Sequence, residues 1–202
     1  MSGAHTTTPP FQPLAGVRIV ELAGLHPGPH ASVLLSQFGA EVVKVERPDG
    51  GDGTRALGGT SFAYLNRNKR SVAIDLKTRQ GVDRVTALFA QADVVVEGFR
   101  PGVADRLGVG YEAARAQRSD VVYCAISSYG QTGPYRDRTA HDLNCLALGG
   151  YFAMPAQVQE HRGARPRVRL ADYACSMYAA LSISLALQHA RATGQSCYLD
   201  VS

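Results

Sequence analysis

The chain has 202 residues, of which 45% are hydrophobic and 19% are charged, so it can bury a substantial core as one large or two small domains. Its formal net charge is only +4, and its basic residues are interspersed with acids, which disfavours a nucleic-acid partner and favours a phosphorylated small molecule. The four cysteines form no CxxC pair and lack metal-ligand spacing. We therefore expect reduced thiols, no metal site and a cytoplasmic location.

Residues 1–12 lack a charged segment followed by an apolar one, so they are predicted to be a disordered leader and not a signal peptide. Residues 17–23 (VRIVELA) and 41–45 (EVVKV) are strand-like, and residues 29–38 between them have helical spacing. These three segments predict a βαβ unit. The glycine-rich segment 48–59 (PDGGDGTRALGG) that follows has no periodicity and is predicted to be a loop or a series of turns.

The same alternation continues along the chain. Strand patterns occupy residues 71–75, 93–97 and 120–127, and helical patterns occupy residues 78–90 and part of 104–118. Strands that alternate with helices predict an α/β fold with a Rossmann-like parallel sheet and helices on both faces.

Two further helices and a last strand are predicted near the end of the chain. The helices cover residues 141–148 and 170–192, and the strand covers residues 196–202. Residues 170–187 are long enough to cross a bilayer, but they include Asp172, three serines and two tyrosines, which favours a buried helix and no membrane partner. Because the last strand ends without a turn, we expect the chain to be cut.

Ligands bind open α/β sheets at the carboxyl ends of the strands, so the residues after each strand are candidates. The first such segment, residues 23–29 (AGLHPGP), suits close backbone approach to a phosphate at a helix N-terminus. The glycine spacing of this segment is not GxGxxG, but Glu46 follows it at about the distance at which a dinucleotide site has an acidic residue. Two interpretations of the segment therefore remain open, a dinucleotide site and a tight turn that binds no ligand. Seven basic residues, several of which follow strand ends, indicate either a solvated face or an anionic ligand; they are Arg47, Arg67, Lys69, Arg70, Lys77, Arg100 and Arg106.

Two residues have both a structural and a catalytic interpretation. Asp172 opens a long apolar helix, where it is either the N-cap or a partly buried nucleophile or base. His141 begins a shorter apolar helix in RTAHDLNCLALGG, either as an imidazole satisfied at the helix start or as a general base. The residues alone leave both questions open.

Several blocks in fixed order resemble the N-terminal half of the class III (CaiB/BaiF-type) CoA-transferase family. They are residues 13–52, NRNKRSVAIDLK, ADVVVEGFRPGVADRLGVGYE, SSYGQTGPYRDRTAHDLN, LADYACSMYAALSISLAL and ATGQSCYLDVS. The resemblance implies that residues 13–202 form the CoA-binding Rossmann-like large domain of this fold, truncated before the small domain and the C-terminal part. It also implies a homodimer or a complementary C-terminal chain, because family dimers are built from full-length chains.

The resemblance further implies a CoA site made of residues that follow successive strands. These are His26, Pro27, Arg47, Ile74, Asp75, Leu76, Lys77, Gly98, Phe99, Arg100, Arg106, Ser127, Ser128, Tyr129 and Gly130. The 3′-phosphate and diphosphate of CoA would account for the recurring basic residues. The transferases often have a lysine in place of Ser127.

Asp172 matches the catalytic aspartate of the family. In the transferases this carboxylate attacks an acyl-CoA thioester and forms a mixed anhydride, which CoA and a small acceptor carboxylic acid then resolve. In the 2-methylacyl-CoA racemases the same position exchanges the α-proton together with a histidine that matches His141. We therefore expect an acyl-CoA:carboxylate CoA-transferase, with a racemase and a non-catalytic CoA-binding half as alternatives.

Overall fold

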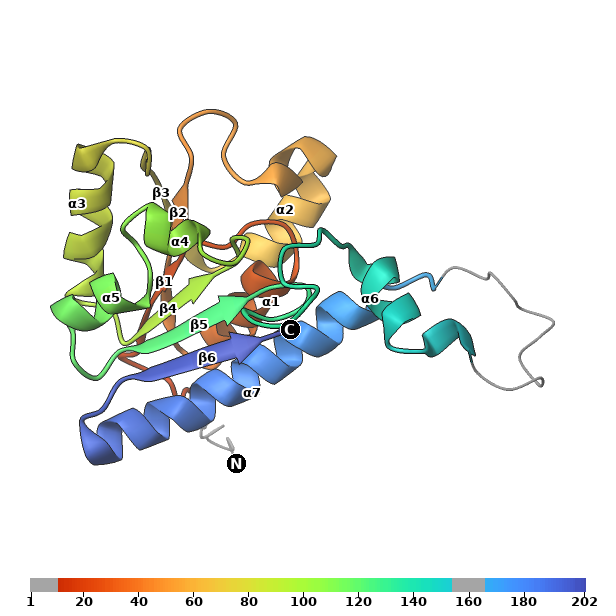
Figure 1. Ribbon diagram of the computed structural model, residues 1–202. Coiled ribbons are helices and arrows are strands. Elements are labelled where there is room, and N and C mark those ends of the chain that lie inside the picture. The colour runs from red at the N-terminus through yellow and green to blue at the C-terminus, as the bar shows by residue number, and fades with distance from the viewer. Residues whose placement is uncertain (1–10, 154–165) are drawn as a thin grey trace, which may run out of the picture.

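The structure is a computed structural model that describes residues 11–153 and 166–202. Six strands form one parallel sheet in the order β3-β2-β1-β4-β5-β6 (Figure 1). The strands are β1 (Arg18–Glu21), β2 (Glu41–Glu46), β3 (Lys69–Ala73), β4 (Val94–Glu97), β5 (Val122–Ile126) and β6 (Cys197–Val201). Every pairing is parallel, so the predicted α/β fold with a Rossmann-like parallel sheet is confirmed.

Helices cover both faces of this sheet. The helices are α1 (Pro27–Gln37), α2 (Gly59–Asn66), α3 (Arg79–Phe89), α4 (Val103–Arg106), α5 (Tyr111–Gln117), α6 (Asp142–Leu148) and α7 (Leu170–Thr193), with short 3₁₀ turns η1 (Gly53–Leu57) and η2 (Tyr151–Ala153). Helices α1 and α7 pack against one face, and α3 and α5 pack against the other. The central strands are therefore buried on both sides, which explains why β4 is an uninterrupted valine run with Val94, Val95 and Val96 fully buried.

Two predicted elements differ from the structure. The segment 48–59 is a loop as predicted up to η1, but helix α2 begins at Gly59 and was not predicted, because GTSFAYLN has no apolar periodicity. The single partly helical range 104–118 is divided into α4 and α5. Gly108 lies between them with φ +76°, a left-handed conformation that ends α4.

Helix α7 is buried on one face only, so the prediction of a buried helix is half right. Ala179 and Ile183 are fully buried against the sheet and α1. Its other face presents Met177, Tyr178, Leu181 and Leu185, which are 57–65% exposed. By length and hydropathy alone α7 could also cross a membrane, although 28% of its apolar window is buried inside the fold.

The predicted leader lies mostly outside the described residues, since residues 1–10 are not among them. Phe11 packs edge-on against Phe38 at a ring distance of 6.3 Å, and the backbone N–H of Leu14 donates to the carbonyl of Phe38. The N-terminal segment is thus attached to the end of α1 from residue 11 onward. All four cysteines are free thiols.

Candidate active site

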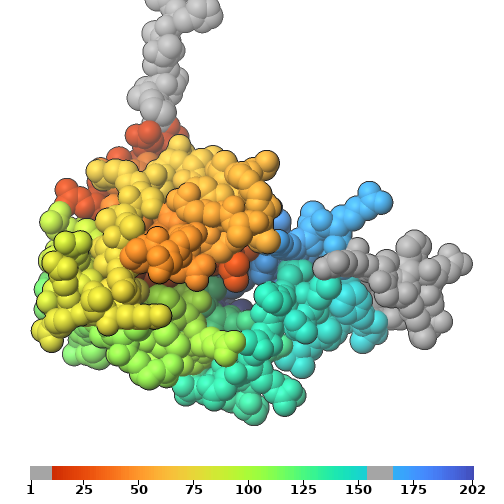
Figure 2. All heavy atoms as spheres, turned by 90° about the horizontal axis from the view of Figure 1, so that it is seen from above, coloured from red at the N-terminus to blue at the C-terminus, as the bar shows by residue number. Residues whose placement is uncertain are grey.

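Because all six strands are parallel, their carboxyl ends lie at one edge of the sheet. The residues predicted to bind CoA follow β1, β2, β3, β4 and β5, so the topology brings them to this edge. Figure 2 shows a hollow on this side of the molecule between the orange, green and teal segments of the chain. Arg47, Lys77, Arg100 and Arg106 follow β2, β3 and β4 in the chain and are all exposed, so their charges are available to an anionic ligand.

The turn after β1 is held close to its neighbours by glycine. A Cβ added at Gly28 would lie 2.3 Å from the Cβ of Ala23, and one at Gly98 would lie 3.3 Å from the same atom. Pro27 occupies the first turn of α1, where its missing N–H costs no helical hydrogen bond. Leu25 has φ 62°, a conformation that is uncommon for a residue with a side chain. The close packing therefore fixes the backbone conformation of residues 24–28.

A buried ionic network lies beneath this edge. Lys44 is 1% exposed, and its Nζ lies 2.6 Å from Oε1 of Glu21 and 2.7 Å from Oδ2 of Asp52. Lys69 lies 2.7 Å from the other oxygen of Glu21, which also accepts the hydroxyl of Ser32. Burial works against the charge of Lys44, but the two carboxylates outweigh it and raise its pKa; burial lowers the pKa of Lys69 to about 8.

Lys69 is therefore neither a solvated residue nor a free ligand contact, the two interpretations that its sequence position allowed. Its side chain is 1% exposed, and its Nζ also donates to the carbonyl of Pro29. Arg70, by contrast, lies on the surface and pairs with exposed Glu41 at 2.8 Å. Of the two neighbouring bases, one stabilises the interior and the other a solvated face.

The carboxylate of Glu46 is already occupied by other protein groups. It accepts from Nε and Nη2 of Arg55, each at 2.8 Å, from the backbone N–H of Asp52 and from the hydroxyl of Ser71. These bonds, led by that of Arg55, lower the pKa of Glu46 to about 2. The dinucleotide interpretation needed a free acid at this place, so the structure does not support it. The same loop positions Arg47, whose Nε donates to the carbonyl of Gly51 at 2.9 Å.

Asp172 lies in the first turn of α7 but does not cap the helix. The N-cap is Arg169, which makes no side-chain capping bond. The backbone N–H of Asp172 donates to Oδ1 of Asp142 at 3.0 Å, which connects α7 to α6. Partial burial, followed by the charge of Asp142, raises the pKa of Asp172. The structure thus excludes the N-cap interpretation and leaves a partly buried carboxylate whose side chain is 21% exposed.

His26, in the turn after β1, lies next to the carboxylate of Asp172. Nδ1 of His26 lies 4.0 Å from Oδ2 of Asp172, and its ring stacks on that of His30 at 5.4 Å. Tyr173 contacts both imidazoles edge-on, at 4.7 and 4.8 Å. Burial, with smaller effects from His30 and Arg169, lowers the pKa of His26 to about 4, so the ring is neutral at neutral pH.

His141 and Asp142 complete this group of side chains. His141 is the exposed N-cap residue of α6, and its backbone N–H donates to Oδ1 of Asn144 at 3.0 Å. The next residue, Asp142, accepts the hydrogen bond from the backbone N–H of Asp172. His141 therefore lies at a helix start, as the sequence allowed, and is adjacent in the chain to the aspartate that contacts Asp172. The sequence did not identify Asp142, although it is adjacent to His141.

The remaining predicted CoA residues offer contacts of different kinds. The side chain of Ile74 is buried in the core, so only its backbone can reach a ligand. The backbone N–H of Lys77 donates to Oδ1 of Asp75, which forms a tight turn after β3. Ser127 continues the ladder through its backbone N–H to Val201, and its buried hydroxyl has no partner among the residues that the structure describes.

A parallel sheet in this strand order, with a glycine-rich first turn and exposed basic residues after its strands, defines a Rossmann-like fold. The model of CoA-transferase family III matches residues 14–202. The chain therefore belongs to the CoA-transferase family III.

Individual relatives agree with this assignment. The chain is 36% identical to a succinate–glutarate CoA-transferase of Agrobacterium fabrum, over 94% of this chain and 50% of that protein. It is 39% identical to an alpha-methylacyl-CoA racemase of Mus musculus, over 94% of this chain and 47% of that protein. The crystal structure of a CaiB/BaiF family protein from Brucella suis superposes with a TM-score of 0.89 at 33% identity, covering 95% of this chain and 53% of that one. The chain thus spans about half the length of the relatives it matches.

Proposed function

We propose that the chain is the CoA-binding part of an acyl-CoA:carboxylate CoA-transferase in which Asp172 is the nucleophile. The observation that supports this most is the 4.0 Å approach of Asp172 to His26. It places a partly buried carboxylate against the turn after β1, at the edge where the predicted CoA residues gather. The names of relatives such as the succinate–glutarate CoA-transferase support the same reaction class.

In the proposed reaction, a carboxylate oxygen of Asp172 attacks the carbonyl carbon of the acyl-CoA thioester. The C–S bond breaks, CoA leaves as a thiolate, and a mixed anhydride remains on Asp172. The thiolate then attacks the aspartyl carbonyl carbon, which releases the donor acid as a carboxylate and leaves an aspartyl-CoA thioester. An acceptor carboxylate reverses both steps, so the products are the new acyl-CoA and free Asp172.

The surroundings of Asp172 suit this role. A raised pKa makes the ionised carboxylate a stronger nucleophile, and the hydrogen bond from its backbone to Asp142 fixes its place at the start of α7. The neutral ring of His26 can offer an N–H to an oxygen of the carboxylate or the anhydride without forming a permanent ion pair. These groups hold the nucleophile while the basic edge holds CoA.

For CoA we propose the residues after the five successive strands. Arg47, Lys77, Arg100 and Arg106 supply charge for the 3′-phosphate and diphosphate, since guanidinium and ammonium groups form charge-assisted hydrogen bonds with phosphate oxygens. The backbone of residues 26–27, 74–76, 98–99 and 127–130 lines the path between them. Loss of one such arginine is expected to weaken CoA binding by about tenfold, measured by calorimetry.

We also propose that the chain acts as a homodimer or with a complementary C-terminal chain. The exposed apolar face of α7, made of Met177, Tyr178, Leu181 and Leu185, is its proposed contact surface, because apolar side chains gain stability when water is removed from them. The free thiols are compatible with a cytoplasmic location, which we propose for the assembly. Light scattering distinguishes a complex of two unlike chains from a homodimer of this one.

A racemase is the second candidate, because Asp142, the residue after His141, accepts a hydrogen bond from the backbone N–H of Asp172. The match to an alpha-methylacyl-CoA racemase supports it. It predicts uptake of deuterium at the α-carbon of a 2-methylacyl-CoA in heavy water, with no change of thioester partner. Absence of deuterium uptake in a folded preparation that exchanges CoA eliminates this candidate.

The test is CoA exchange between succinyl-CoA and a panel of carboxylic acids, with the chain alone and with its complementary polypeptide. We expect new acyl-CoA products that disappear in Asp172→Asn and persist in the control Asp83→Asn, which changes an exposed carboxylate on α3. Binding of CoA without exchange under any condition would instead identify a non-catalytic CoA-binding half.

A further inference from the structure

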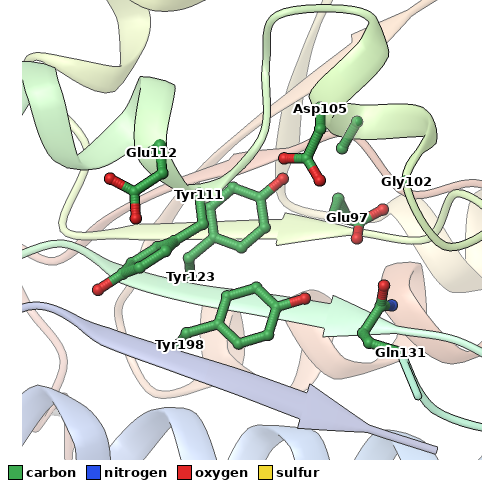
Figure 3. A pocket seen from close by; sticks show the side chains of 9 residues that line it. Glu97, Gly102, Asp105, Tyr111, Glu112, Tyr123, Gln131 and Tyr198 are labelled. Atoms are coloured by element: carbon green, nitrogen blue, oxygen red, sulfur yellow. The ribbon is translucent and has the colours of Figure 1, made fainter. Parts of the chain in front are cut away.

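A second pocket lies on the face of the sheet opposite α7 and Asp172. It has a volume of about 370 Å³ and opens between α4, α5 and the strands β4, β5 and β6 (Figure 3). Three carboxylates and three tyrosines line it: Glu97, Asp105, Glu112, Tyr111, Tyr123 and Tyr198. No lysine, arginine or histidine is among the lining residues in the part of the chain that the structure describes. The pocket is therefore acidic and aromatic.

Glu97 is the buried acid of this pocket. It is 4% exposed, and its carboxylate points into the cavity from the end of β4. Its one hydrogen bond in the described residues comes from the backbone N–H of Phe99, at 2.7 Å. Burial raises the pKa of Glu97 to about 7, and the charge of Asp105 adds to this effect. A carboxylate in such a position lacks a positive partner.

The tyrosines present rings and edges to the same space. Tyr123 and Tyr198 stack with ring centroids 5.9 Å apart, and Tyr111 lies 5.3 Å from Tyr198. The hydroxyl of Tyr123 already donates to the carbonyl of Val109. Burial, followed by the charges of Glu97, Asp200 and Asp105, raises the pKa of Tyr198 to about 12. Aromatic faces beside a carboxylate are the surroundings that bind alkylated cations.

The basic side chains near the pocket lie at its rim. Arg115 pairs with Glu112 at 3.5 Å, so Glu112 has its own counter-charge. Arg106 and Arg136 approach the lining residue Gly102, with guanidinium nitrogens 3.5 and 4.0 Å from the position of an added Cβ, but neither lines the pocket. Gln131 also points into the cavity, and its buried amide nitrogen has no partner among the described residues. Rotation of this amide places its oxygen there, as an acceptor for an N–H group.

We propose that this pocket binds one small alkylammonium cation, with Glu97 and Asp105 as its counter-charges and the rings of Tyr123 and Tyr198 against its alkyl groups. The ammonium group gives Glu97 the positive partner it lacks, and its remaining protons reach the Gln131 amide. Because Glu97 also holds the backbone of Phe99, occupancy stabilises the turn that follows β4. The pocket lies on the face of the sheet opposite α7, and its proposed ligand is a cation, whereas the adjacent residues Phe99 and Arg106 belong to the proposed CoA site.

Calorimetric titration with butylammonium chloride tests this proposal, with 1-butanol and butyrate as matched probes without the positive charge. We expect butylammonium to bind more tightly than either, and Glu97→Gln to weaken it by about tenfold or more. Glu112→Gln is the control and is expected to change the affinity by less than about fivefold, because Glu112 is exposed and already paired. Equal affinity for butanol and butylammonium, or unchanged binding to Glu97→Gln, overturns the proposal.

Two further measurements keep the test independent of folding and of the ligand source. Asp105→Asn lies on the surface and is expected to weaken binding without loss of the folded circular dichroism spectrum. Affinity is expected to fall as the pH drops below about 7, where Glu97 takes up a proton; the titratable groups that line the pocket with it are Asp105, Glu112, Tyr111, Tyr123 and Tyr198. A lysine tripeptide with blocked ends that binds more tightly than butylammonium identifies a protein side chain as the source, and the reverse identifies a free amine. CoA exchange is not a readout here, so this result does not depend on the proposed reaction.

Discussion

Removal of the Lys44 ammonium group is expected to destabilise the fold strongly. Lys44 is 1% exposed, and its Nζ contacts Glu21, Asp52 and the carbonyl of Ala23, at 2.6, 2.7 and 2.7 Å. Lys44→Met keeps most of the aliphatic volume but leaves the carboxylates short of one positive charge. Breaking a buried ion pair in this way costs about 3–5 kcal/mol. That is a large part of a domain stability of about 5–15 kcal/mol.

Urea denaturation followed by circular dichroism measures this change as a shift in the free energy of unfolding at unchanged slope. Arg79→Met is the matched control, because Arg79 is 90% exposed and pairs with Asp83 on the surface of α3. The control is expected to lose less than about 1 kcal/mol. An equally small loss for Lys44→Met would refute the reasoning that this network is a main source of stability.

Three further predictions follow from single contacts. Gly28→Ala places a Cβ 2.3 Å from that of Ala23 and is expected to lower the free energy of unfolding by about 1–3 kcal/mol. Gly59→Ala is the control, because its added Cβ has nothing within 4 Å. Equal melting temperatures of the two variants would contradict the predicted clash at Gly28. Glu46 has its pKa lowered to about 2, so it stabilises the fold above its ordinary pKa and this contribution is lost as the pH falls toward about 2. In Glu46→Gln the free energy of unfolding should therefore decrease less as the pH is lowered. An unchanged pH dependence would contradict the stabilising role of the Glu46 carboxylate. Asp172 has a raised pKa, and only its ionised form is the nucleophile, so the rate of CoA exchange should decrease as the pH is lowered, with a midpoint above the pKa of an ordinary aspartate. A midpoint at or below that ordinary value contradicts the raised pKa of Asp172.

The architecture was predictable because a strand that is buried on both faces of the sheet must consist of apolar residues. Val94–Val96 must be apolar without alternation if helices cover both sides of β4, and the sequence shows that run. Helix α2 has no such record, since most of its residues lie on the surface and its buried contacts come from Leu65 and Asn66 only. Local pattern cannot predict an element that is positioned by its tertiary contacts.

The ionic network shows a different limit. Lys69 and Glu21 lie far apart in the sequence, and they meet because β3 and β1 both flank β2. A lysine in a basic run resembles a surface residue until the strand order is known. For the same reason the sequence did not reveal the pocket at Glu97, whose lining comes from three strands, two helices and the loop residues Gly102 and Gln131. The sequence pattern indicated where charged residues occur, but only the strand order of the sheet shows which of them form ion pairs.

The candidate catalytic group was partly predictable. The resemblance identified Asp172 and His141, and the structure puts His26 and Asp142 beside Asp172. Asp142 was missed because its role depends on a hydrogen bond between α6 and α7, which no local spacing encodes. Its position next to His141 was the only available signal.

The most direct test of the proposed reaction is a covalent one. The chain, alone and with a complementary C-terminal chain, is incubated with succinyl-CoA and trapped with hydroxylamine. Its nitrogen attacks the aspartyl carbonyl of the anhydride or of the aspartyl-CoA thioester, expels the acid or CoA, and leaves an aspartyl hydroxamate that peptide mass spectrometry can locate. We expect the hydroxamate at Asp172, dependent on succinyl-CoA and absent from Asp172→Asn. CoA exchange that proceeds with no label at Asp172, or at the same rate in Asp172→Asn, contradicts the assignment of Asp172 as the nucleophile.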